Sequence, residues 1–207
     1  MTLLEALAAH RLLAIIRGTD PAACARTAAV LLDNGISLLE VSLTSTDALD
    51  VLERVAASAP ADTHIGAGTV LSAADARRAR DAGANFTVTP ALGEGVQASV
   101  DLGLPVLAGA LTPSEVLAAH RAGATAVKVF PASSLGPGHV AALRAPFPDI
   151  PLVPVGGIGL DDVQRYLDAG ALAVGVGSPL TGDAPDGGDS AELERRARAF
   201  VAKAVRS

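Results

Sequence analysis

A lysine stands where a charge is costly, in the middle of an apolar stretch of this 207-residue sequence. Lys128 occupies the run Ala-Val-Lys-Val-Phe-Pro, and the chain has only one other lysine, Lys203, since arginine supplies the rest of its positive charge. Burial disfavours an ammonium ion, and the neutral amine is a nucleophile for ketones, whereas arginine does not deprotonate. Lys128 is therefore either a Schiff-base lysine or one half of a structural salt bridge.

Glu40 is a carboxylate in a similarly apolar stretch. Side chains of a strand alternate between two faces, so Glu40, Ser42 and Thr44 share one face. Lys128 and Phe130 share a face for the same reason. If both faces point into one interior, the carboxylate meets the amine and relays the protons that carbinolamine formation and collapse require. The alternative is a buried ion pair between the two residues without a catalytic role.

Other residues are suited to holding an anion. Arg17 ends an apolar run and can present its planar guanidinium to a carboxylate. Thr69 follows Gly66-Ala67-Gly68, whose glycines let a ligand approach the backbone, although the same motif also suits an ordinary turn. Two Gly-rich turns, 155–159 and 174–179, offer backbone amides to a phosphate. Their alternative explanation is a tight turn that requires glycine for positive φ.

Short apolar segments recur at regular intervals and predict the elements that position these groups. Eight of them are candidate strands, at residues 12–17, 38–44, 64–70, 85–90, 106–111, 126–131, 152–158 and 172–177. Helical patterns lie between them, such as 21–33 and 75–81, and several end at a glycine in the manner of a helix C-cap: Gly35, Gly83, Gly103, Gly123 and Gly170. Strands that are apolar on both faces and alternate with helices require a buried parallel sheet.

We therefore predict an α/β protein, a (β/α)8 TIM barrel that forms a single domain over residues 1–207, with an extra N-terminal helix at 2–10. The competing architecture is an open doubly wound sheet. The Gly-, Asp- and Pro-rich stretch 181–190 predicts a mobile loop before a final amphipathic helix at 191–205. Active sites of such barrels lie at the carboxyl ends of the strands, where the polar residues above are found.

The composition excludes several classes of function. A net charge of −6 without a basic face argues against a nucleic-acid partner. Cys24 is the only cysteine, which excludes an internal disulfide and favours a reducing compartment. The four histidines are scattered and no His or Cys cluster suits a catalytic metal, so we expect neither metal nor cofactor. No apolar run reaches the roughly 18 residues of a membrane span, so we expect no membrane partner and a cytoplasmic location.

With these residues identified, the sequence resembles the family of 2-keto-3-deoxy-6-phosphogluconate and 2-keto-3-deoxy-6-phosphogalactonate aldolases over residues 12–180. Six motifs in this order carry the resemblance: Leu39-Glu40-Val41, Ile65-Gly66-Ala67-Gly68-Thr69-Val70, Val88-Thr89-Pro90, Lys128-Val129-Phe130-Pro131, Gly156-Gly157-Ile158 and Gly177-Ser178.

The resemblance implies a metal-independent class I aldolase without a cofactor, in which Lys128 forms the Schiff base and Glu40 is the acid/base. It implies cleavage of a phosphorylated keto-deoxy sugar acid to pyruvate and glyceraldehyde 3-phosphate by a homotrimer. The remaining positions that it matches contact the substrate, line the pocket or bind its phosphate: Arg17, Thr69, Pro90, Phe130, Gly156, Gly157, Gly177 and Ser178.

Two departures from the family pattern leave the substrate open. Many phosphogluconate members have an arginine at the position of Thr44, where it contacts the pyruvyl carboxylate, and Arg17 is the candidate replacement. Val155 looks more like the phosphogalactonate branch. The choice between the C4 epimers and activity on 4-hydroxy-2-oxoglutarate both stay open. Two other functions compete on the same barrel, a non-catalytic phosphosugar-binding protein and a phosphosugar isomerase or epimerase.

Overall fold

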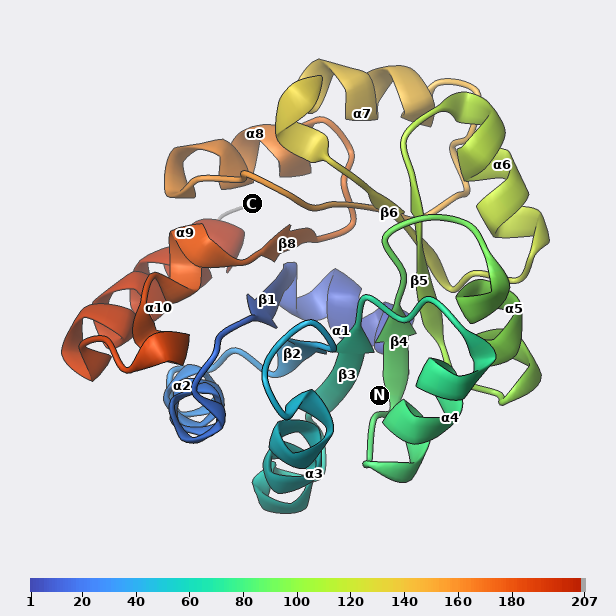
Figure 1. The fold of residues 1–207 in the computed structure, drawn as a ribbon. Helices are drawn as coiled ribbons and strands as arrows, with labels where there is room; N and C mark the ends of the chain where they lie inside the picture. Colours follow the sequence, from blue (N-terminus) through green and yellow to red (C-terminus); the bar gives the residue numbers. More distant parts are fainter. Residues whose placement is uncertain (206–207) are drawn as a thin grey trace.

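The computed structural model describes residues 1–205, in which eight parallel strands form the centre and helices surround them (Figure 1). Neighbouring strands pair in the order β7-β6-β5-β4-β3-β2-β1-β8. A parallel bridge between Val155 and Gly175 joins the two ends of this sheet, so the strands close into the predicted barrel and not into an open doubly wound sheet. The strands are β1 Leu12–Ile16, β2 Leu38–Ser42, β3 His64–Gly68, β4 Phe86–Val88, β5 Val106–Ala110, β6 Ala126–Val129, β7 Leu152–Pro154 and β8 Val174–Val176.

Helices follow the strands and several end at a glycine, as the sequence predicts. The backbone at all five predicted stop glycines is left-handed, with φ between 71° and 94° at Gly35, Gly83, Gly103, Gly123 and Gly170. The helices are α1 Leu3–His10, α2 Pro21–Asp33, α3 Ala48–Ser58, α4 Ala73–Asp81, α5 Glu94–Asp101, α6 Pro113–Arg121, α7 Pro137–Arg144, α8 Val163–Asp168, α9 Ser178–Thr181 and α10 Ser190–Val205, with 3-10 turns η1 Ala132–Ser134, η2 Leu160–Asp162 and η3 Ala184–Asp186.

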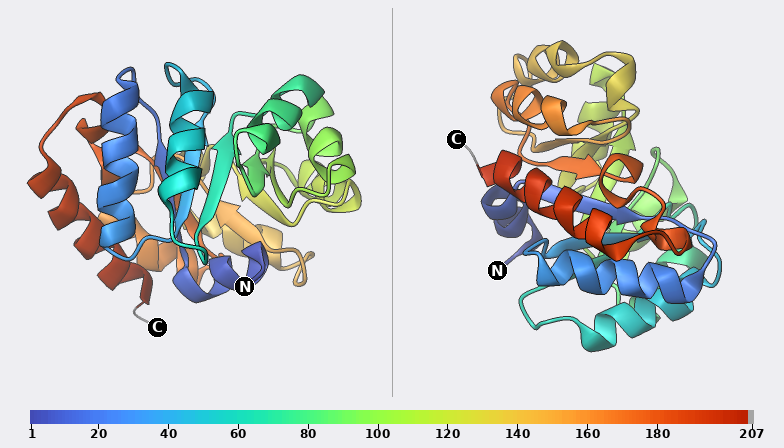
Figure 2. Two further views of the ribbon diagram at one scale, coloured as in Figure 1. Left: turned by 90° about the horizontal axis from the view of Figure 1, so that it is seen from below. Right: turned by 90° about the vertical axis from the view of Figure 1, so that its left-hand side faces the viewer.

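The barrel has two apolar layers, one inside the strands and one between the strands and the helices. The inner cluster includes Leu13, Phe86, Leu107 and Val153, whose side chains fill the barrel, while the other face of the same strands packs against the helices. Helix α1 lies across one end of the barrel (Figure 2), and its Leu7 belongs to the inner cluster. The helix therefore plugs that end and leaves the carboxyl ends of the strands as the open end.

The strands are shorter than the sequence predicts. Each strand stops before the predicted segment does, most clearly β7, which ends at Pro154 where the prediction ran to residue 158. Some of the residues that follow the strands, such as Thr69, Phe130 and Val155, line a cavity at the open end. None of the helices within residues 1–205 is long and apolar enough to span a membrane. Positions 206–207 of the predicted domain lie outside the described residues.

The segment 181–190, which the sequence predicts to be a mobile loop, contains a 3-10 turn and makes tertiary contacts in its middle. Ala184 and Pro185 of η3 are buried. The Oδ1 atom of Asp186 accepts hydrogen bonds from the backbone nitrogen of Thr19 at 2.6 Å and from the hydroxyl of Thr19 at 2.8 Å. Gly18 lets Pro185 approach, since a Cβ at position 18 would lie 2.4 Å from the Pro185 carbonyl oxygen. The segment therefore holds the loop after β1, next to Arg17.

Candidate active site

A cavity of about 210 Å³ opens at the carboxyl ends of the strands. Its wall contains every site residue predicted from the sequence, together with three more: Ile15, Arg17, Glu40, Thr69, Pro90, Lys128, Phe130, Val155, Gly156, Gly157, Gly177, Ser178 and Pro179. A larger hollow of about 540 Å³ lies against α1 and shares no lining residue with this cavity. Since Lys128 and Glu40 both line the smaller cavity, it is the candidate active site.

Lys128 and Glu40 both point into the interior of the barrel, as the two-residue alternation predicts. Lys128 on β6 is 6% exposed and Glu40 on β2 is 1% exposed. No ion pair within 4.0 Å joins them, and within residues 1–205 no carboxylate lies that close to Lys128. The amine instead lies 5.2 Å from the ring centroid of Phe130. The geometry therefore gives no support to the alternative of a structural salt bridge.

Two glycines of β3 make room for the catalytic candidates from inside the barrel. A Cβ at position 68 would lie 1.8 Å from Oε1 of Glu40, and a Cβ at position 66 would lie 2.4 Å from the ring of Phe86. The sequence interpretation, that these glycines admit a ligand, is wrong, because they admit neighbouring side chains. The other carboxylate oxygen of Glu40, Oε2, is buried and has no hydrogen-bond partner among the described residues. That oxygen is free to exchange a proton with a bound molecule.

Hydroxyl groups connect Arg17 to Thr69 behind the cavity wall. Nε of Arg17 donates to Oγ of Ser42 at 3.4 Å, and this Oγ lies 3.2 Å from Oγ1 of Thr69 and 2.8 Å from Oγ1 of Thr44. Thr69 has a left-handed backbone with φ of 60°, which turns the chain sharply at the end of β3. The two terminal nitrogens of the guanidinium make no hydrogen bond within residues 1–205, so they are available to an anion.

The backbone requires glycine in one of the two Gly-rich loops but not in the other. Gly156 and Gly157 have φ of 102° and 71°, so the loop after β7 needs glycine for its left-handed backbone. Gly157 also leaves space for Ser133, whose Oγ would lie 2.5 Å from a Cβ at that position. Gly177 has φ of −99°, so a tight turn does not explain it. It immediately precedes Ser178, and both residues line the cavity.

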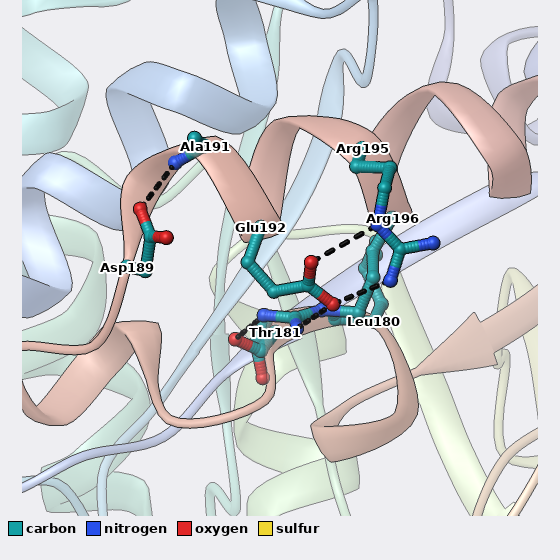
Figure 3. Close-up of polar contacts among 7 residues, drawn as sticks. All are labelled: Leu180, Thr181, Asp189, Ala191, Glu192, Arg195 and Arg196. Atoms are coloured by element: carbon teal, nitrogen blue, oxygen red, sulfur yellow. Dashed lines mark hydrogen bonds and ion pairs between the residues drawn. The ribbon is translucent and has the colours of Figure 1, made fainter.

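Helix α10 is hydrogen-bonded to the loop after β8 through the side chain of Arg196 (Figure 3). Nε of Arg196 donates to the carbonyl oxygen of Leu180 at 2.7 Å, and its Nη2 donates to that of Thr181 at 3.1 Å. Its Nη1 also contacts Glu192 at 3.1 Å. Arg196 thus satisfies the carbonyls at the end of α9, the helix that begins at the cavity wall. Helical spacing distinguishes it from the neighbouring Arg195, because Arg196 lies three residues after Leu193 and four before Phe200, both of which are buried.

Comparisons with known proteins show the family of this chain. The profile of the family described as "KDPG and KHG aldolase" matches residues 3–195. The chain belongs to the KDPG and KHG aldolase family. Its enzymes are class I aldolases, which are lyases.

Individual members of the aldolase family differ in substrate. The chain is 36% identical over 193 residues to a probable 2-dehydro-3-deoxy-6-phosphogalactonate aldolase of Rhizobium meliloti, covering 92% of this chain and 90% of that one. It is also 36% identical over 167 residues to a 2-dehydro-3-deoxy-phosphogluconate aldolase of Pseudomonas aeruginosa, covering 79% and 76%. A structure of KDPG aldolase from Legionella pneumophila, with pyruvate captured at low pH as a covalent carbinolamine intermediate, matches with a TM-score of 0.85 and 27% identity over 97% of this chain and 98% of that one.

Three cavity residues of this aldolase were absent from the sequence prediction, namely Ile15, Val155 and Pro179. Ile15 was predictable, because it lies two residues before Arg17 and so shares its face of β1. Val155 and Pro179 lie in the Gly-rich turns 155–159 and 174–179, which the sequence predicts to bind phosphate, but neither was predicted as a site residue. Within residues 1–205, no group of three or more His, Cys, Asp or Glu side chains is arranged to hold a metal ion.

Proposed function

We propose that this aldolase cleaves 2-keto-3-deoxy-6-phosphogluconate or its galactonate epimer to pyruvate and glyceraldehyde 3-phosphate through a Schiff base on Lys128. The observation that carries the proposal is a buried amine that shares its cavity with Glu40 but is not salt-bridged to it. A structural salt bridge would place a carboxylate within 4.0 Å of the amine, and within residues 1–205 none lies there. A lysine that only binds phosphate stays protonated and forms no adduct with a ketone, so the labelling experiment below separates the two roles.

The reaction begins when the neutral amine of Lys128 attacks the C2 ketone of the substrate. Glu40 protonates the departing hydroxyl of the carbinolamine, directly or through a water, and water leaves to give the iminium. Loss of the C4 hydroxyl proton to a base breaks the C3–C4 bond, releases the aldehyde and moves the electron pair into an enamine. Protonation at C3 gives the pyruvate imine, and hydrolysis returns pyruvate and the free amine. No step requires a metal or a cofactor.

Capture of pyruvate in the relative from Legionella pneumophila supports this first step. A carbinolamine is the adduct of an amine with a carbonyl carbon, and that protein holds pyruvate in this form. Its identity to this chain is only 27%, so the role of Lys128 is tested on this chain itself.

The two ends of the substrate fit the two polar regions of the cavity wall. Arg17 and Thr69 offer a guanidinium and a hydroxyl to the C1 carboxylate. The loops containing Gly156 and Gly157, and Gly177 and Ser178, offer backbone amides to the phosphate, which is how an acidic protein can hold an anionic ligand.

The decisive experiment is reduction with borohydride in the presence of pyruvate, followed by peptide mass spectrometry. The expected product is a reduced pyruvyl adduct on Lys128, and Lys203 in the final helix is the internal control because it is the only other lysine. Lys128→Ala abolishes turnover, whereas Lys203→Ala leaves it unchanged. A Lys128→Ala rate within about tenfold of the wild type, or about 1.4 kcal/mol of barrier, contradicts the proposal. A binding protein, or an isomerase or epimerase on the same barrel, gives no adduct.

The choice of substrate is tested by parallel rate measurements on the two phosphorylated epimers and on 4-hydroxy-2-oxoglutarate. Val155 favours the galactonate epimer, while relatives named for either activity are 36% identical to the chain. The family resemblance also supports a single-domain, cytoplasmic homotrimer, and light scattering of the purified protein tests the trimer.

A further inference from the structure

We infer that Ser42 is a positioning residue that sets the direction of the hydrogen bonds made by Thr69 and anchors Arg17, and thereby builds the carboxylate end of the site. The inference rests on the proposed function, in which these two residues hold the substrate carboxylate. Ser42 is 0% exposed and is not part of the cavity wall, so it acts only through its neighbours.

The hydroxyl of Ser42 is the centre of a three-way contact between the ends of β1, β2 and β3. Arg17 Nε lies 3.4 Å from it, Thr44 Oγ1 lies 2.8 Å from it and Thr69 Oγ1 lies 3.2 Å from it. Within residues 1–205, the Arg17 and Thr69 side chains make no other hydrogen bond. Ser42 is therefore the one group through which the two candidate carboxylate ligands are connected.

The numbers of donors and acceptors restrict how this contact is made. A serine hydroxyl has one proton and two lone pairs, and a guanidinium has donors only. One lone pair of Ser42 therefore accepts from Arg17. The other lone pair and the proton remain for Thr44 and Thr69, so one threonine donates to Ser42 and the other accepts from it.

A bound carboxylate selects one of these two orders, because an ionised carboxylate only accepts. Thr69 gives its proton to the carboxylate, so it must accept from Ser42, and Ser42 must then accept from Thr44. The donors run in one direction, from the exposed Thr44 through Ser42 and Thr69 to the anion. Every lone pair and proton of Ser42 is then used, and each hydrogen bond strengthens the next.

The test measures the pyruvate concentration that gives half-maximal borohydride labelling of Lys128. Ser42→Ala removes the donor to Thr69 and the acceptor for Arg17, so this concentration rises about tenfold. Ser42→Thr keeps the hydroxyl and restores labelling to within about threefold of the wild-type value. Labelling by hydroxyacetone, a ketone without a carboxylate, is unchanged in both variants, since it offers no anion to Arg17 or Thr69.

Ser99→Ala is the matched control. Ser99 is also 0% exposed, but its hydroxyl bonds to Thr87 and to the Gly95 carbonyl, on elements that do not carry the carboxylate ligands. The Ser99→Ala variant lowers the unfolding temperature of the protein without changing the half-saturating pyruvate concentration. The inference is wrong if Ser42→Ala is labelled at wild-type pyruvate concentrations, or if hydroxyacetone labelling weakens by the same factor. Absence of labelling in the wild type refutes the proposed function instead.

A second variant covers the case in which Ser42→Ala does not fold. Thr44→Val at the exposed end of the chain of hydroxyls removes its outermost donor and keeps the shape of the side chain. The half-saturating pyruvate concentration then rises about threefold, less than for Ser42→Ala, because Ser42 can still donate to Thr69. An unchanged value contradicts the inference.

Discussion

A single methyl group at Gly68 is expected to inactivate the aldolase without unfolding it. In Gly68→Ala the new Cβ would lie 1.8 Å from Oε1 of Glu40. Ordinary contact begins at 3.4 Å, so the carboxylate must retreat by about 1.6 Å, the difference between these two distances. The same Cβ would lie 2.5 Å from Cδ and 2.7 Å from Cγ of Glu40, so most of this side chain must move, at a cost of about 1–3 kcal/mol in stability.

The effect on catalysis is larger than the effect on stability. Displacement of a catalytic group by about 1 Å can cost about a hundredfold in rate, so kcat of Gly68→Ala should fall by at least about a hundredfold, or about 2.7 kcal/mol of barrier. Combining it with Glu40→Asp, which shortens the side chain by one methylene, should recover part of the loss. The double variant is then more active than the product of the two single effects predicts.

The assay couples pyruvate release to a dehydrogenase, and circular dichroism and thermal unfolding check that each variant is folded. Gly138→Ala is the control, since a Cβ at position 138 on α7 meets nothing within 4 Å, and its kcat should equal that of the wild type. A folded Gly68→Ala enzyme with kcat within about threefold of the wild type would refute the reasoning, because the placement of Glu40 would then not limit the reaction.

Two further predictions concern segments that support the site. Arg196→Ala should raise KM for the phosphorylated substrate about tenfold, because the end of α9 loses two hydrogen bonds. Borohydride labelling of Lys128 with pyruvate should not change. The control is Arg195→Ala, which removes a side chain that is 71% exposed and should leave both measurements unchanged. Hydrogen bonds from the backbone and hydroxyl of Thr19 lower the pKa of Asp186 below its ordinary value of 3.8. The Asp186 carboxylate therefore stabilises the fold above pH 3.8 and loses this contribution as the pH falls through the lowered pKa. The unfolding temperatures of the wild type and Asp186→Asn should therefore converge in acid, and parallel curves would contradict the role of this carboxylate.

The sequence alone determined the features that depend on local periodicity and backbone conformation. The strands, the glycine stops such as Gly35 and the inward faces of Glu40 and Lys128 were predictable, because a residue's face follows from its position in the alternation and left-handed backbone favours glycine. The eight strands alternating with helices also predicted the barrel that brings both residues to one cavity.

Only the tertiary structure decided what depends on contacts between distant segments. It showed that the space beside Gly68 is filled by the carboxylate of Glu40 and not left for a ligand. It placed the hydroxyl of Ser42 between Arg17 and Thr69. It also showed that the segment 181–190 is hydrogen-bonded to Thr19. It also separated Lys128 from every carboxylate by more than 4.0 Å within residues 1–205, a distance that no spacing along the chain specifies. That distance counts against the structural salt bridge, which burial alone could not do, because a lysine is buried in either case.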